Sequence, residues 1–102
     1  MKIEKPLVHH FQEYLKEVDY DLLGGSRYVF IFENEYGASV ISHIGSYGGR
    51  EGLWEIAVLK NDGNGKYDIR YDSGITEDVI GYLSDDQVNE YLGMIKNLQQ
   101  IA

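Results

Sequence analysis

The amino-acid sequence predicts an α+β fold, a two-layer sandwich in which a four-stranded antiparallel β-meander is flanked by an N-terminal and a C-terminal helix. β-branched and aromatic runs alternate with short turns through the middle of the chain, and apolar residues recur at helical spacing near both ends. A chain of 102 residues supports one hydrophobic core, and it contains no linker, repeat or low-complexity stretch. We therefore expect a single domain, 1–102.

A helix is predicted at each end of the chain. Pro6 suits a first helical turn, and the apolar residues after it fall at positions 7, 8, 11, 15 and 18, which form one stripe. Near the C-terminus, the Ser-Asp-Asp-Gln run from Ser84 to Gln87 has the pattern of a capping box, and an apolar stripe at 88, 91, 92, 95 and 98 follows it. A short helical turn, capped by Thr76, is also predicted over 76–79.

Four strands are predicted between these helices, over residues 27–33, 38–43, 53–60 and 66–71. The first is the strongest, because β-branched and aromatic residues fill it. Turns of Asn, Asp and Gly residues follow it at 34–37 and separate the last two strands at 61–65. Such short connections make neighbouring strands antiparallel and place both helices on one face of the sheet.

Net charge and composition exclude several classes of function. Seventeen acidic residues against nine basic ones give a formal charge of −8, which argues against direct nucleic-acid binding, since Lys and Arg supply the phosphate contacts. The absence of cysteine excludes disulfides and cysteine-ligated zinc. The N-terminal residues lack a signal-peptide core and no apolar run has membrane-spanning length, so we expect a cytoplasmic protein without a membrane partner.

Acidic residues gather in the stretch 72–90, which contains no Lys or Arg. They are Asp72, Glu77, Asp78, Asp85, Asp86 and Glu90. One interpretation is an acidic partner surface that attracts a basic protein or imitates a phosphate backbone. The other is a solvated face whose acids stabilise helix N-termini.

A glycine-rich segment between the second and third predicted strands is the main candidate binding site. Gly45 to Gly52 contains four further residues besides its glycines, and the only tryptophan follows it. The candidate ligand- or partner-binding residues are Tyr47, Gly48, Gly49, Arg50 and Trp54. The segment can be a strand connection, a protein-binding loop or a nucleotide site, although its spacing matches neither a P-loop nor a dinucleotide fingerprint.

No set of residues indicates catalysis or metal binding. His9 and His10 can share a helix face with Glu13, but these are too few metal ligands unless His43 joins them. Ser42 and His43 are adjacent in a predicted strand and so point to opposite faces. We therefore expect no enzymatic activity, no metal and no other cofactor.

A resemblance covers residues 27–100. The runs Tyr-Gly-Ala-Ser-Val at 36–40, Ser-Tyr-Gly-Gly at 46–49 and Gly-Leu-Trp-Glu-Ile-Ala-Val at 52–58 carry it, and it continues through Tyr71-Asp72, Ile75-Thr76, Asp78-Val79, Gly81 and Leu83. This pattern resembles a group of small uncharacterised phage and prophage proteins. The chain departs from it at Gly74, where a proline is expected, and at Tyr82, where a tryptophan is usual. The resemblance implies a phage origin, and hence the host bacterial cytoplasm, and carries over no catalytic residue.

The leading hypothesis is a small acidic phage accessory protein that acts by binding and inhibits a host or anti-phage defence protein. The acidic stretch or the glycine-rich segment would engage that partner, in the first case by nucleic-acid mimicry. Two alternatives remain open: a nucleotide or small-ligand binder that uses the segment from Gly45 to Gly52, and a virion or assembly component.

Overall fold

The computed structural model describes residues 6–22, 25–70 and 79–98. Its elements, in chain order, are η1 (Gln12–Tyr14), β1 (Leu15–Leu22), β2 (Gly25–Ile31), β3 (Tyr36–Ser42), η2 (Gly49–Glu51), β4 (Trp54–Asn61), β5 (Tyr67–Ile69), β6 (Ile80–Leu83) and α1 (Asp85–Lys96), where η1 and η2 are 3₁₀ turns.

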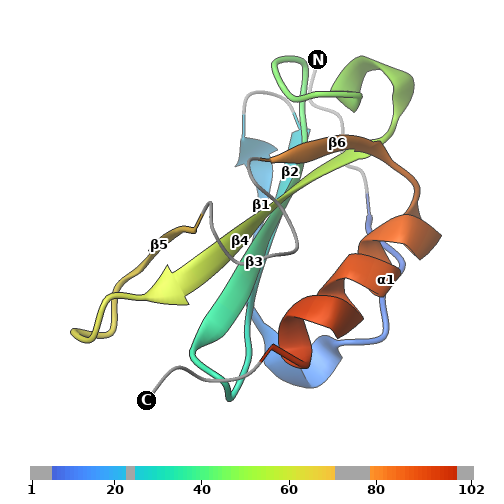
Figure 1. Cartoon of the computed structure of the whole chain (residues 1–102). Coiled ribbons are helices and arrows are strands. Elements are labelled where there is room, and N and C mark those ends of the chain that lie inside the picture. The colour runs from blue at the N-terminus through green and yellow to red at the C-terminus, as the bar shows by residue number, and fades with distance from the viewer. Residues whose placement is uncertain (1–5, 23–24, 71–78, 99–102) are drawn as a thin grey trace.

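All described strands form one antiparallel sheet of six strands in the order β1-β2-β3-β4-β5. The last strand, β6, also pairs with β4. The first half of β4 pairs with β6, where Trp54 lies opposite Leu83, and the second half pairs with β5, where Leu59 lies opposite Ile69. Helix α1 lies across one face of this sheet (Figure 1).

The core fills the space between the sheet and α1. Its fully buried residues come from β2, β3, β4 and α1: Phe30, Val40, Trp54, Ile56, Val58, Val88, Leu92 and Ile95. Their alternation along the strands and their helical spacing in α1 follow the sequence pattern. The capping box is confirmed, because the Gln87 amide donates to Ser84 Oγ at 3.2 Å and the Ser84 amide donates to Gln87 Oε1 at 2.9 Å.

The predicted fold, a four-stranded meander flanked by two helices, is wrong. The described residues form six strands and one α-helix, and the region predicted as the N-terminal helix holds an irregular segment, η1 and β1. A β-bulge explains the misleading pattern, since the register shifts between Leu15 and Glu17. Leu15 and Val18 then face the same side of β1, three residues apart, as they would on a helix.

The remaining strand predictions are confirmed with shifted ends. The predicted strands 27–33, 38–43 and 53–60 correspond to β2, β3 and β4. β5 falls within the predicted strand 66–71, of which residue 71 lies outside the described residues. Strand β6 was not predicted, because it has four residues and includes a glycine. Residues 76–78 of the predicted helical turn lie outside the described residues, and Val79 is not helical.

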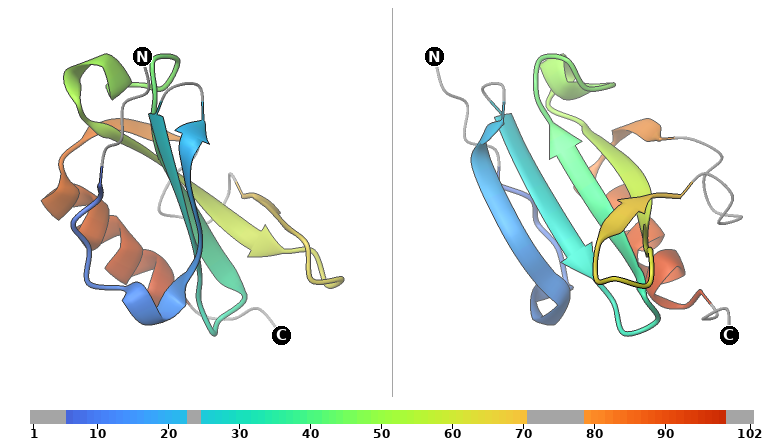
Figure 2. Two further views of the ribbon diagram at one scale, coloured as in Figure 1. Left: turned by 180° about the vertical axis from the view of Figure 1, so that it is seen from behind. Right: turned by 90° about the vertical axis from the view of Figure 1, so that its left-hand side faces the viewer.

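Residues 6–11, here called the strap, complete the layer that α1 forms. The strap runs as an extended segment between α1 and the strands β1 and β2 (Figure 2). Leu7 is buried, and its backbone amide donates to the hydroxyl of Tyr28 at 3.1 Å. The His9 ring stands edge-on to Tyr28 and Phe30, with ring centroids 5.9 and 5.0 Å apart.

Burial shifts the pKa of two titratable side chains at the strap, Tyr28 in β2 and His9 in the strap itself. Burial, and secondarily the hydrogen bond with Tyr20, raises the pKa of Tyr28 to about 12. Burial, and to a smaller extent the neighbouring His10, lowers the pKa of His9 below its ordinary value of 6.5. His9 Nδ1 also accepts a hydrogen bond from the Phe11 amide at 3.2 Å, which only an unprotonated nitrogen can do.

We predict that the free energy of unfolding decreases as the pH is lowered, because of His9. The unfolded chain binds a proton at His9 near pH 6.5 and the folded chain only at lower pH, so this contribution is complete above 6.5 and is lost as pH falls toward the folded pKa. His9→Asn keeps a hydrogen-bond acceptor but does not titrate. Urea unfolding between pH 5 and pH 7.5 should therefore show a smaller pH dependence for His9→Asn than for the wild type. The exposed neighbour serves as the control: if His10→Asn reduces the dependence equally, His9 is not its source.

Candidate functional site

The glycine-rich segment folds into a compact loop, here called the glycine loop (Gly45–Gly52). Its first turn is closed by Ser46, whose Oγ accepts from the His43 amide and donates to the His43 carbonyl, both at 2.9 Å. The amide of Gly49 donates to the Ser46 carbonyl at 3.2 Å, and η2 follows. A hydrogen bond from the Tyr47 amide to Glu55 Oε1, 3.0 Å long, ties the loop to β4.

Glycine is required at positions 49 and 81, because neighbouring groups lie too close for a Cβ atom. A Cβ atom at Gly49 would overlap the carbonyl oxygen of His43, and a Cβ atom at Gly81 would overlap Cβ of Tyr47. The second contact packs β6 directly against the loop, and the Tyr82 amide donates to the Tyr47 carbonyl at 3.1 Å. The loop and β6 are therefore held together by direct backbone contact.

The loop amides do not form a cradle for phosphate. Most of them donate to acceptors within the protein: those of Gly45, Ser46, Tyr47, Gly49, Glu51, Gly52 and Leu53. A phosphate site needs several amides aimed at the ligand. The arrangement thus gives no support to a nucleotide site in this loop.

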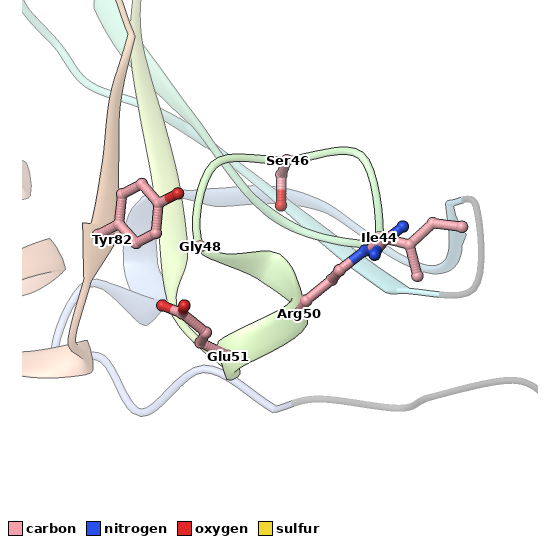
Figure 3. Close-up of a pocket in the computed structure, with 6 residues that line it drawn as sticks. All are labelled: Ile44, Ser46, Gly48, Arg50, Glu51 and Tyr82. Carbon is pink, nitrogen blue, oxygen red and sulfur yellow. The ribbon is translucent and has the colours of Figure 1, made fainter.

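Three large side chains stand exposed where the loop meets β6. Ile44, Tyr47 and Tyr82 are 61%, 60% and 59% exposed, and the Arg50 side chain, also exposed, lies beside Ile44 (Figure 3). We call these four residues the tyrosine surface. Tyr82 has a φ of 60°, a left-handed conformation that is rare for a bulky residue. Ile44 and Tyr82 were not among the residues predicted for a site, because no sequence signal brings position 82 beside position 47.

A shallow hollow of about 160 Å³ lies within this surface. Its lining residues are Ile44, Ser46, Gly48, Arg50, Glu51 and Tyr82. Tyr82 stands on one side and Ile44 and Arg50 on the other, with Glu51 between them at the base of the view (Figure 3). Small-molecule sites usually have about 300–1,000 Å³, so this hollow suits a single side chain of a partner better than a nucleotide.

Trp54 lies away from this surface. Its side chain is fully buried in the core, and its indole Nε1 donates to Asp85 Oδ1 at 2.7 Å. The other carboxylate oxygen of Asp85 accepts from the Val8 amide at 3.1 Å. Trp54 and Asp85 thus join β4, α1 and the strap, and both act inside the fold.

The predicted acidic surface is only partly visible in the described residues. Asp86 and Glu90 are exposed on α1, whereas Asp85 is half-buried with both oxygens bonded. Asp72, Glu77 and Asp78 lie outside the described residues. The structure therefore brings two of the six predicted acids to an exposed helix face.

A second hollow, of about 280 Å³, is lined by Tyr14, Glu33, Asn34 and Lys96. The Asn34 side-chain amide donates to the Ile95 carbonyl at 2.8 Å and the Leu98 carbonyl at 2.9 Å, so it caps the end of α1. The Lys96 ammonium lies 5.6 Å from the centre of the Tyr14 ring. The polar groups of this hollow therefore stabilise the C-terminal end of α1.

Within the described ranges, no three His, Asp or Glu side chains are grouped to hold a metal ion. The described part of the chain likewise contains no helix of the length and apolarity that a membrane span requires. Comparisons with protein-family models, curated proteins and solved structures give no match to this chain.

Replacing Asp85 should destabilise the protein far more than replacing its exposed neighbour. Asp85→Ala leaves the Trp54 indole N–H buried without this acceptor and frees the strap, so we expect a loss of about 3 kcal/mol in the free energy of unfolding. Asp86→Ala removes only a helix-terminal charge and should cost less than about 1 kcal/mol. Urea unfolding followed by Trp54 fluorescence measures both, and equal losses would contradict this role of Asp85.

A methyl group at Gly81 should disrupt the packing of β6 on the glycine loop. We expect Gly81→Ala to cost about 1–3 kcal/mol, because the new Cβ meets Tyr47. Gly93→Ala is the matched control, since its Cβ would lie 4.0 Å from the Phe11 ring and should raise stability by up to about 1 kcal/mol through helix propensity. Thermal unfolding compares the two variants. A neutral Gly81→Ala would show that the loop and β6 are not tightly packed.

Proposed function

We propose that this protein acts by binding another protein through the tyrosine surface. The observation that carries the proposal is the exposure of Ile44, Tyr47 and Tyr82, each about 60% exposed. Ile44 and Tyr82 line one hollow, and the backbone of Tyr47 is hydrogen-bonded to that of Tyr82. Tyrosine and arginine are enriched among the residues that dominate protein–protein binding energy. Exposed apolar clusters of this kind mark interaction sites more often than isolated apolar residues do.

The close packing of the loop against β6 supports the same proposal. Tyr47 and Tyr82 are joined by a backbone hydrogen bond of 3.1 Å, and the Gly81 backbone lies directly against Tyr47. Holding Tyr82 at a φ of 60° costs conformational energy, which the surrounding packing must offset. A surface already ordered before binding loses less entropy when a partner arrives.

The identity of the partner rests on the resemblance to phage and prophage proteins. On that basis we propose an inhibitor of a host or anti-phage defence protein that acts in the bacterial cytoplasm by binding and without catalysis. Nucleic-acid mimicry has less support, because Asp86 and Glu90 are the exposed acids of the described part of the 72–90 stretch. A small-ligand role has less support because the loop amides are bonded within the protein.

Site-specific crosslinking tests the proposal. A photoreactive amino acid in place of Ile44 should give one discrete protein adduct in bacterial cells that express the chain. The same replacement at Met94, which is 50% exposed on α1, is the matched control and should not give that adduct. The same adduct from both positions, or none from position 44, would contradict the assignment.

Variants of the two tyrosines then test the surface with the purified partner. Tyr47→Ala removes one aromatic side chain, and Tyr82→Asn removes the other while suiting the left-handed backbone. We expect each to weaken binding by about 2 kcal/mol, or about 30-fold in Kd, as measured by calorimetry. Met94→Ala should leave Kd unchanged. Tyrosine variants that fold normally and bind like the wild type would reject the tyrosine surface.

A further inference from the structure

One line of residues on α1 follows the strap along its length. Asp85 Oδ2 accepts from the Val8 amide at 3.1 Å. One turn later, the Asn89 side chain donates to the Val8 carbonyl at 2.9 Å and accepts from the His10 amide at 3.0 Å. Another turn on, Gly93 lies beside Phe11, whose ring would be 4.0 Å from a Cβ atom at that position. The spacing of four residues places all three on one face of the helix.

The strap side chains alternate as those of a bound extended peptide do. Leu7 is buried, and His9 and Phe11 are half-buried. The His9 ring packs on Phe30 in β2, and the centroid of the Phe11 ring lies 6.1 Å from that of Phe32, which directly follows β2. Val8, between them, is 64% exposed, and His10 is exposed as well. Every second side chain therefore points inward, while the backbone is bonded by side chains of α1 and β2.

From these contacts we infer that the site between α1 and β2 is a peptide-binding site that the strap occupies in the resting protein. Its ligand is an extended segment of a partner protein with apolar or aromatic side chains at three alternating positions. Asp85, Asn89 and the Tyr28 hydroxyl bind backbone groups, which every sequence has, and the inward side chains supply specificity.

The strap is suited to leave this site without unfolding of the sheet. It is joined to β1 through η1, none of whose residues is buried. The side chains of Asp85 and Asn89 bond its backbone to α1, and the pairing of β1 with β2 begins only at Leu15, so release of the strap leaves that pairing intact. Segments held in this way open locally more often than core strands do. The strap thus competes with the partner segment, at a site separate from the tyrosine surface.

Peptide binding to the full chain tests this inference. The probe is a fluorescein-labelled peptide with the sequence of residues 6–12, and the receptor is the Leu7→Ser/Phe11→Ser double variant, whose own strap is weakened. By fluorescence anisotropy, the peptide should bind this variant at least tenfold more tightly than it binds the wild-type chain. In a control peptide, the residues of positions 7 and 8 are exchanged, and so are those of positions 10 and 11. This control should bind the double variant at least tenfold more weakly than the peptide with the natural order.

Variants on α1 supply the matched pair. Adding Asn89→Ala to the double variant should weaken peptide binding at least tenfold, whereas Glu90→Ala, one position along and exposed, should not change it. The inference is overturned if the folded double variant does not bind the peptide, or if Asn89→Ala and Glu90→Ala behave alike. It is also overturned if light scattering shows wild-type chains forming a dimer that depends on Asn89, because the occupant is then a second copy.

Hydrogen exchange on the wild-type chain gives a test that does not depend on the folding of any variant. The amides of Val8 and His10 should exchange at least tenfold faster than those of Ile56 and Val58 in β4, and their rates should not follow global unfolding in low urea. Exchange of all four amides at the global unfolding rate would mean that the strap does not open by itself, which would overturn the inference.

Discussion

The carboxylate of Asp85 connects the three parts of this fold. One oxygen accepts from the indole of Trp54 in the centre of the core, and the other accepts from the backbone of Val8 in the strap. Asp85 is also the first residue of α1, where a negative charge favours the helix. Sheet, strap and helix therefore share one group, and the position of α1 over β4 depends on it.

Close backbone contact plays the corresponding part at the other end of β6. Gly81 and Gly49 allow the glycine loop, β6 and the end of β3 to approach more closely than side chains would permit. Most of the loop amides donate hydrogen bonds within the protein, whereas the side chains of Tyr47 and Tyr82 are exposed. The glycines thus have a structural role, and the two tyrosine side chains face the solvent. The strap and the tyrosine surface lie on different elements of the fold.

Local patterns predicted much of the sheet and of α1. The alternation in β2 and β4 and the capping box at Ser84 are decided by neighbours in the sequence, so they could be recognised there. The N-terminal helix was predicted wrongly because a bulge after Leu15 reproduces helical spacing in a strand. Among the candidate site residues, Tyr47 and Arg50 lie on the exposed surface, whereas Trp54 is buried.

The sequence by itself determined that the chain combines a β-sheet with a C-terminal helix, and it located the antiparallel strands β2 to β5 and the start of α1, because alternation, turn residues and caps act over a few positions. Only the tertiary structure decided that residues 6–11 form a strap, that β1 is an edge strand, that β6 pairs beside β5, and that the backbone of Tyr82 lies beside that of Tyr47. The places of the strap and of Tyr82 depend on contacts between residues more than thirty positions apart, such as Asp85 with Val8 and Tyr82 with Tyr47, and such contacts leave no local pattern.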